Sequence, residues 1–256
     1  MEGVLHSPLV ARWPLSSPQA ASVLCYPPRQ RGCDPDMVAS QVEGAGVCCL
    51  LDLGDVELSL NGVRVRVLGK GHSSVVAAGL LENGDVVAVK VRRTDSKRAS
   101  LEDEGRLLEE AARAGASPRP IYYSRDVIVM QYVGDASLER LLEGASARAI
   151  AIAVLEALRA ARALDLALVL HEELHRPLRN VFYPRWPESP RALVIDLESA
   201  SRGCGNVNKI VSFLLARGLV GGGEGLRALL REYREGKCPR DLYLEVEGAV
   251  RRSLGL

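Results

Sequence analysis

The sequence predicts an α+β protein in two parts, an antiparallel sheet with one helix followed by a mostly helical region. Three observations support this. Short apolar runs that alternate with polar residues fill residues 56–91, and Asn-Gly turns separate them, which is typical of antiparallel hairpins. A capped amphipathic segment at residues 101–114 predicts a single helix after these strands. Beyond Gly134, alanine- and leucine-rich stretches such as Ala147–Leu164 predict further helices.

Length and composition are those of an ordinary globular protein. The 256 residues suffice for one large domain or two small ones, 47% of them are apolar, and the formal net charge is +1. Because there is no excess of positive charge, the composition does not indicate a nucleic-acid partner. No apolar run approaches the roughly 20 residues that span a bilayer, and residues 1–14 do not resemble a signal peptide. We therefore expect a cytoplasmic protein without membrane segments.

The first 55 residues are the least regular part of the chain. Asp34-Pro35-Asp36 predicts a helix start, because Asp caps helices and Pro suits their first turn. Residues 47–53 predict a short strand, and Asn61-Gly62 predicts a hairpin turn between two further strands. The predicted organisation is an accessory region at residues 1–55, a sheet region at 56–133 and a helical region at 134–256.

The six cysteines show no C-x-x-C spacing, which argues against a zinc ribbon or a redox motif. We expect most of them to be reduced thiols. A bridge among Cys25, Cys33 and the pair Cys48-Cys49 stays open as an alternative, because intracellular proteins of hyperthermophiles carry disulfides.

The most informative stretch is Val67–Val91, VLGKGHSSVVAAGLLENGDVVAVKV. Gly69 and Gly71 lie between two alternating runs, and a polar turn leads into a third run that contains Lys90. A Walker loop requires Gly-Lys-Ser/Thr at the start of a helix, and a dinucleotide fingerprint requires a helix directly after its glycines. Because Val75–Leu80 has the pattern of a strand, both are excluded. The remaining phosphate-binding pattern is a glycine-rich hairpin followed by V-A-x-K.

The order Gly69-x-Gly71-x-x-Ser74-x-Val76, then Val87-Ala88-Val89-Lys90, resembles this pattern of protein kinases, with serine in place of the third glycine. The resemblance covers about residues 64–215 and is closest to compact archaeal Ser/Thr kinases of the RIO-like branch. It implies a two-lobed fold, with a sheet and one helix in the first lobe and a helical second lobe. It also implies ATP- and Mg²⁺-dependent phosphorylation of Ser or Thr hydroxyls on a protein substrate.

The same resemblance implies roles for individual residues. Lys90 would contact the α- and β-phosphates, and Glu104 of the following helix would orient it, with Glu102 as the rival acid. In the run VIVMQYVG, Met130 would lie behind the adenine, and backbone groups of the next residues would bond to it. The nucleotide-binding residues would thus be Gly69, Gly71, Ser74, Val76, Ala88, Lys90, Glu104, Met130, Gln131 and Val133.

The stretch HEELHRPLRN, which runs from His171 to Asn180, resembles the catalytic loop H-x-D-L-H-x-x-N of kinase-like enzymes. Glu173 stands in place of the usual Asp, and two extra residues separate it from Asn180. Downstream, Asp196-Leu197-Glu198 resembles the metal-binding D-F-G motif in its D-F-E form. The resemblance implies that Glu173 is the base or orients the acceptor hydroxyl, with His175 as the next candidate. Asn180 and Asp196 would hold Mg²⁺.

The residues His171-Glu172-Glu173-Leu174-His175 also match the H-E-x-x-H motif of zinc metalloproteases. Two histidines four apart on a helix would both face Zn²⁺, with Glu172 as base. Against this, Pro177 would end such a helix at once, and most of the chain would have no role. Within the kinase-like interpretation, a nucleotide-binding pseudokinase scaffold and a small-molecule kinase remain alternatives.

Overall fold

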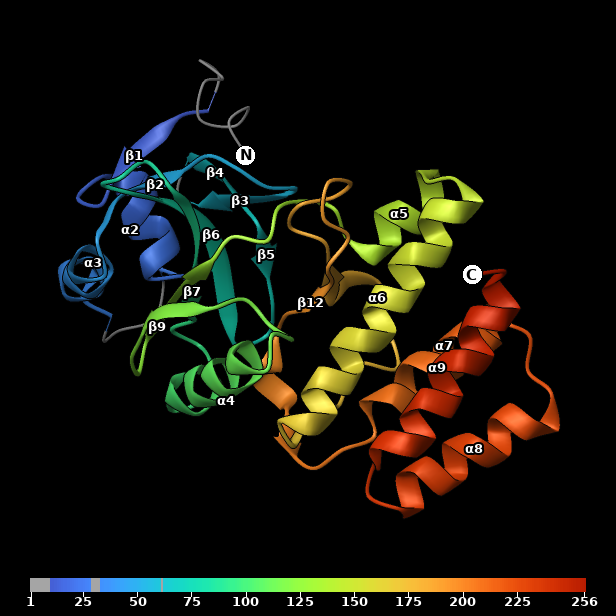
Figure 1. Cartoon of the computed structure of the whole chain (residues 1–256). Helices are drawn as coiled ribbons and strands as arrows, with labels where there is room; N and C mark the ends of the chain where they lie inside the picture. Colours follow the sequence, from blue (N-terminus) through green and yellow to red (C-terminus); the bar gives the residue numbers. More distant parts are fainter. Residues whose placement is uncertain (1–9, 29–32, 61) are drawn as a thin grey trace. The chain divides into compact units, whose positions relative to one another are not determined.

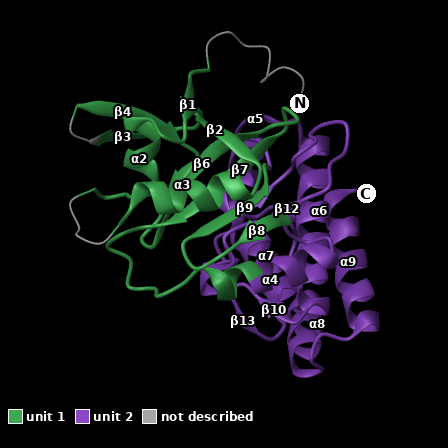
Figure 2. Cartoon of the chain, turned by 90° about the vertical axis from the view of Figure 1, so that its left-hand side faces the viewer, with its two compact units in different colours: residues 1–105, 120–132 green, residues 106–119, 133–256 purple. Residues whose placement is uncertain are grey.

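The computed structural model describes residues 10–28, 33–60 and 62–256 and shows a mixed α+β protein. The chain divides into two compact units, residues 1–105 with 120–132 and residues 106–119 with 133–256 (Figure 2). The first unit contains a large antiparallel sheet and the second is mostly helical. The α+β class predicted from the sequence is confirmed. Within the described ranges, no helix has both the length and the apolar character that crossing a bilayer requires.

The first unit is built on a seven-stranded sheet with the order β1-β2-β6-β7-β9-β8, and β5 pairs with β6 (Figure 1). All neighbouring strands are antiparallel. The strands are β1 (Arg12–Pro14), β2 (Val47–Leu51), β5 (Gly69–Lys70), β6 (Ser74–Leu81), β7 (Val86–Arg92), β8 (Pro120–Tyr123) and β9 (Val127–Gln131). A separate hairpin joins β3 (Val56–Leu60) to β4 (Val63–Val67) as predicted, although Asn61 of its turn lies outside the described residues.

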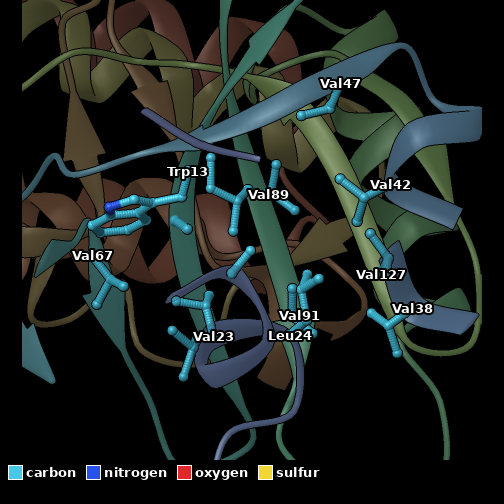
Figure 3. Packing of buried hydrophobic residues seen from close by; sticks show 14 of the residues in the cluster. Trp13, Val23, Leu24, Val38, Val42, Val47, Val67, Val89, Val91 and Val127 are labelled. Atoms are coloured by element: carbon cyan, nitrogen blue, oxygen red, sulfur yellow. The ribbon is translucent and has the colours of Figure 1, made fainter. Parts of the chain in front are cut away.

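The two faces of this sheet differ. Since side chains alternate along a strand, the odd-numbered residues of β6, β7 and β9 share one face. Most of them belong to a buried apolar cluster: Val75, Ala77, Val87, Val89, Val91, Val127 and Val129. The other members of that cluster come largely from the first 55 residues, including Trp13 and the helices α2 (Pro18–Leu24) and α3 (Pro35–Gly44) (Figure 3). The accessory region therefore covers one face of the sheet with its own core. The even-numbered residues, Lys90 among them, lie on the opposite face.

Local capping explains the helices that cover the sheet. The Ser17 hydroxyl accepts a hydrogen bond from the Ala20 N–H, and Pro18 occupies the first turn of α2. The Asp34 carboxylate accepts from the Asp36 N–H at the start of α3, which confirms the helix start predicted there. Each helix thus begins where its sequence provides a partner for an unpaired backbone N–H.

The second unit consists mainly of helices. Its elements are α5 (Leu138–Gly144), α6 (Ala147–Leu166), α7 (Asn206–Ala216), α8 (Glu224–Glu235) and α9 (Arg240–Leu254), with the 3₁₀ turns η1 (Pro177–Arg179) and η2 (Leu197–Ser199). Two short strand pairs, β10 (Val169–Leu170) with β13 (Ser201–Arg202) and β11 (Val181–Phe182) with β12 (Leu193–Val194), complete it. Helix α4 (Glu102–Arg113) contributes residues to both units.

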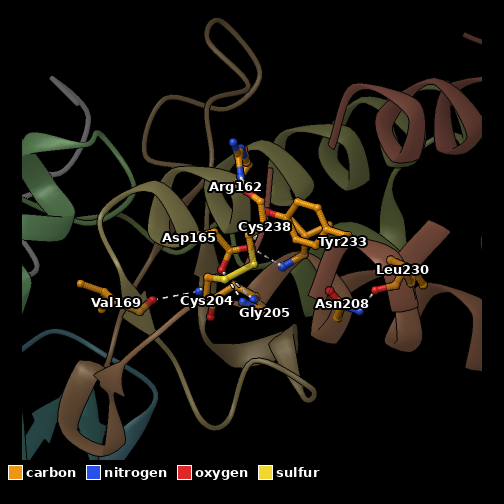
Figure 4. Close-up of a disulfide and its surroundings, with 11 residues drawn as sticks. Arg162, Asp165, Val169, Cys204, Gly205, Asn208, Leu230, Tyr233 and Cys238 are labelled. Atoms are coloured by element: carbon orange, nitrogen blue, oxygen red, sulfur yellow. Dashed lines mark hydrogen bonds between the residues drawn. A yellow bond between two sulfur atoms is a disulfide. The ribbon is translucent and has the colours of Figure 1, made fainter. Parts of the chain in front are cut away.

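A buried carboxylate organises the interior of the second unit (Figure 4). Asp165, near the end of α6, accepts hydrogen bonds of 2.8 Å from the backbone N–H groups of Gly205 and Asn206 and from the Asn206 side chain. Its second oxygen accepts from the Tyr233 hydroxyl at 2.8 Å. Because these N–H groups begin helix α7, the helix dipole also favours the negative charge. Asp165 thereby connects α6, α7 and α8.

Two disulfides are present, Cys25–Cys33 and Cys204–Cys238, while Cys48 and Cys49 are free thiols. The expectation that most cysteines are reduced is therefore wrong. The first bridge is among the pairings that the sequence left open, but the second is not. Its cysteines lie 34 residues apart and are joined because the loop before α7 meets the segment between α8 and α9. Sequence spacing does not reveal such proximity.

Candidate functional site

The glycine-rich stretch forms a hairpin in the first unit. Gly69 pairs with Val76 across β5 and β6, and the Gly71 N–H donates to the Ser74 carbonyl at 2.9 Å. Packing does not require either glycine, because a Cβ at Gly69 would meet nothing within 4 Å and one at Gly71 would approach no closer than 3.7 Å. Neither has a positive φ. What the glycines do provide is bare backbone, to which a ligand has close access.

Arg93, just after β7, ties this hairpin in place. Its backbone N–H donates to the Ser73 carbonyl at 2.8 Å, and its guanidinium donates to the Gly71 carbonyl at 2.7 Å. Asp95 holds the same guanidinium with both carboxylate oxygens and so raises the pKa of Arg93. The ring of Tyr26, from the accessory region, lies 5.2 Å from Lys70 Nζ and 5.3 Å from the Arg93 guanidinium carbon. The sequence pattern pointed to neither Arg93 nor Tyr26.

Lys90 forms a buried ion pair with Glu104. Lys90 Nζ lies 2.6 Å from Glu104 Oε1, and the two side chains are only 4% and 6% exposed. Of the two acids that the sequence offered, Glu104 is thus the one that pairs with Lys90, while Glu102 is exposed in the first turn of α4. The next helix residue, Gly105, has no space for a side chain, since a Cβ would lie 2.4 Å from the ring of Tyr123 on β8. This close approach of α4 to the sheet brings Glu104 to Lys90.

Other predicted nucleotide-binding residues share the face of the sheet that carries Lys90. Val76 lies directly opposite Lys90, and Ala88 lies directly opposite Met130. Ser74 is buried at the start of β6, whereas Gln131 ends β9 opposite Val87 and so lies on the other face. Val133 is buried and belongs to the second unit.

In the second unit, His171 connects the two halves of the predicted catalytic region. It is 1% exposed, its Nε2 lies 3.0 Å from the Ile195 carbonyl, and its Nδ1 accepts from the Glu173 N–H at 3.2 Å. Since a carbonyl can only accept, Nε2 carries the proton and the ring is neutral. Burial lowers the pKa of His171, outweighing the nearby carboxylates of Glu173 and Asp196. The ring therefore positions the backbone of Glu173 relative to the strand before Asp196.

The two predicted metal ligands lie beside a pair of short strands: Asn180 directly precedes β11, and Asp196 follows β12. Val181 of β11 lies opposite Val194 of β12, and the Ile195 N–H donates to the Asn180 carbonyl at 2.9 Å. Asp196, the next residue, has the left-handed conformation φ 63°, ψ 65°. This conformation is uncommon outside glycine and costs on the order of 1–3 kcal/mol, and such strain clusters at functional sites. The 3₁₀ turn η1 directly precedes Asn180.

Lys209 of α7 was missed by the sequence analysis. Its ammonium donates to the His171 carbonyl at 2.8 Å and to the Glu172 carboxylate at 3.0 Å. Hydrogen bonds from Lys209, and next from Ser201, lower the pKa of Glu172. Lys209 thereby fixes the start of the predicted catalytic loop, whereas His175 is exposed at its surface. The sequence gives one indication that Lys209 has a special role: lysine is rare in this arginine-rich chain.

No model of a known protein family matches the chain, and no curated protein matches it. Its chemistry must therefore be argued from its own residues. The hairpin fits a phosphate group, because the Gly69 backbone is bare and the buried Ser73 hydroxyl has no hydrogen-bond partner among the described residues. Asn180 and Asp196 offer oxygen atoms, which Mg²⁺ prefers.

The zinc motif finds no support in this geometry. The described segment from His171 to Arg176 consists of turns, whereas H-E-x-x-H requires a helix. Both ring nitrogens of His171 are engaged with the backbone, and Glu172 is held by Lys209. In the described part of the chain, no group of three His, Cys, Asp or Glu side chains is placed to hold a metal ion.

Proposed function

We propose that this protein is an ATP- and Mg²⁺-dependent phosphotransferase of the protein-kinase-like class, with a protein Ser or Thr hydroxyl as acceptor. The buried Lys90–Glu104 pair is the observation that carries the proposal. Desolvation offsets much of the attraction within a buried ion pair, and an apolar pair often stabilises a core equally well. Lys90 is a buried ammonium that lies directly opposite Val76, and Val76 pairs with Gly69 of the glycine hairpin. A buried charge in this position therefore calls for a functional reason. Binding of phosphate oxygens supplies one.

Each residue assigned to the proposed function has a defined task. Lys90 would contact the α- and β-phosphates as a compact point charge, and Glu104 would restrict its orientation. Backbone N–H groups of the hairpin other than that of Gly71, which donates to the Ser74 carbonyl, would donate to phosphate oxygens. Asn180 and Asp196 would hold Mg²⁺. When bound, this ion neutralises charge on the phosphates during transfer.

Glu173 would accept the proton of the acceptor hydroxyl or orient that hydroxyl. Glutamate is one methylene longer than the aspartate of related loops, so the backbone must lie further from the acceptor. The two extra residues between Glu173 and Asn180 would allow such a displacement, and the turn η1 lies between these two positions. The backbone N–H of Glu173 is bound to His171, so the loop can support a carboxylate in a constant position.

The experiment is incubation with γ-labelled ATP and Mg²⁺, with autophosphorylation and transfer to casein as the two readouts. Glu173→Gln should lower turnover by about 10²–10⁴-fold, the usual contribution of a positioned base, with little change in nucleotide affinity. Asp196→Asn should weaken Mg²⁺-dependent nucleotide binding and turnover together. Glu188→Gln, at an exposed position, is the matched control. If neither ATP nor GTP with Mg²⁺ raises the melting temperature of the wild type, the proposal fails.

A nucleotide-binding scaffold is the second candidate, because Glu173 stands where kinase-like loops carry aspartate. This candidate predicts a thermal shift with ATP·Mg²⁺ but no transfer to protein or to small-molecule hydroxyls. If both wild type and Glu173→Gln bind ATP and neither transfers phosphate, this candidate is supported. Equal turnover of the two would instead show that Glu173 is not the base and make His175 the next candidate. Transfer to small hydroxyl compounds alone would instead indicate a small-molecule kinase.

A further inference from the structure

The second unit contains an open cavity of about 830 Å³, the α7–α8 groove, whose lining comes from helices α7 and α8. Its volume lies within the range of typical ligand sites. None of its lining residues belongs to the site proposed above. Both helices lie in the same unit, and their arrangement is visible in Figure 1.

Three arginines of α8 line this cavity: Arg227, Arg231 and Arg234. They are spaced four and three residues apart and therefore lie along one face of the helix. All three are exposed, and none of their guanidinium groups has an ion pair or hydrogen bond within the described part of the chain. Other arginines of the chain, such as Arg92 and Arg159, are paired with carboxylates. Glu235 is the only acid on the lining, so positive charge is in excess.

The rest of the lining is small or apolar. Ser212 and Ala216 lie one turn apart on α7, and Leu215 and Leu230 add aliphatic surface. Asn208 joins the two helices, because its side-chain N–H donates to the Leu230 carbonyl at 2.6 Å (Figure 4). Its side-chain oxygen is buried without a hydrogen-bond partner among the described residues. The lining thus combines small and aliphatic side chains with a row of positive charges.

We propose that the α7–α8 groove binds an acidic, amphipathic helical segment of a protein partner. The arginine row extends over two helical turns, about 10 Å at the helical rise per residue, so a small anion would reach only part of it. A helix with carboxylates at matching spacing faces all three guanidiniums, and its aliphatic residues cover Ala216 and Leu230. Arginine binds carboxylates in a bidentate geometry. Recognition of amphipathic helices in grooves commonly uses this spacing of contacts.

The test is fluorescence anisotropy with a labelled, capped peptide of about 15 residues, long enough to form a marginal helix. The peptide carries glutamates spaced to face the three arginines and leucines on the adjacent face. We expect saturable binding that weakens as salt rises. Arg227→Gln/Arg231→Gln should weaken binding about tenfold or more, whereas Arg148→Gln, an exposed arginine outside the groove, should leave it unchanged. Because the substituted residues are exposed, all variants should keep the wild-type melting temperature.

Several results would overturn the proposal. Equal binding of a peptide with glutamine in place of glutamate would show that the arginines do not select carboxylates. Equal binding of a scrambled peptide would exclude a helical occupant. Binding only of a peptide with phosphoserine in place of glutamate would show that the groove selects phosphate groups and not carboxylates. Self-association of the wild type that Arg227→Gln/Arg231→Gln abolishes, seen by analytical ultracentrifugation, would make a second copy of this chain the occupant.

Discussion

The buried Lys90–Glu104 pair allows a test that separates stability from function. Its atoms are 2.6 Å apart, and both side chains are almost fully buried. Removing one partner takes this ion pair from the other buried charge, in a place from which water is excluded. Such a change costs about 3–5 kcal/mol, a large share of the roughly 5–15 kcal/mol that stabilises a domain.

The expected shifts are large enough to measure directly. In proteins of about 150–250 residues, 1 kcal/mol corresponds to about 2–4 °C in Tm. Lys90→Met and Glu104→Leu should therefore each lower Tm by about 6–20 °C. The double variant should recover most of this loss, because an apolar pair that replaces a buried ion pair is often neutral or stabilising. The two substitutions are consequently expected to be strongly non-additive.

The assay is thermal unfolding of the wild type, both single variants and the double variant, with and without ATP and Mg²⁺. At a concentration about 100 times Kd, nucleotide should stabilise the wild type by roughly 2.7 kcal/mol, but it should not shift the stable double variant. Additive losses in the double variant would refute the energetic reasoning. A double variant that is stable and still binds ATP normally would refute the assigned role of Lys90.

Three further perturbations test other features. Because burial lowers the pKa of His171 below its ordinary value of 6.5, the unfolded chain takes up a proton there that the folded chain does not. Stability should thus fall as pH decreases below about 6.5, and His171→Gln should flatten this slope in urea titrations while His175→Gln should not. Cys204→Ser/Cys238→Ser opens a loop of 34 residues and should cost about 3.8 kcal/mol by the chain-entropy relation; a loss below about 1 kcal/mol in the same titrations would contradict that. Tyr26→Ala removes a ring that contacts two cations of the glycine hairpin region, and calorimetry should show weaker ATP binding; unchanged affinity would mean that the hairpin does not depend on this contact.

Local patterns made part of this structure predictable. The alternation of β6 and β7 around a polar turn predicted a hairpin, and in the structure Val76 lies opposite Lys90. A strand has a period of two, and a short turn leaves little freedom in register. The helical period placed Glu104 on the apolar face of α4. Both arguments use residues that are close in sequence. The pair Lys90–Glu104 could therefore be anticipated, although only the packing of Gly105 against Tyr123 explains why Glu104 and not Glu102 reaches the lysine.

Long-range contacts were not predictable in the same way. The short helix α2 has a weak pattern of its own, and its position follows from its packing against the sheet. Arg93 lies in a polar run that resembles a solvated loop, yet it holds the glycine hairpin. Asp165 is one acid in an alanine-rich helix, and only the fold shows that three backbone N–H groups of a distant segment point at it. Such roles depend on which segments meet, and single-sequence patterns contain no record of that.

The apolar face beneath α2 and α3 has a practical consequence for anyone who wishes to shorten or recombine this protein. Cutting the chain at residue 56 would preserve the glycine hairpin, Lys90 and Glu104, and would look like a sensible minimal fragment on motif grounds. It would also expose Val75, Val89 and their neighbours, which are now fully buried, as a continuous hydrophobic surface on a sheet. Surfaces of this kind promote aggregation. A soluble fragment or chimera should therefore retain the chain from Val10 onwards, or supply another layer to cover that side.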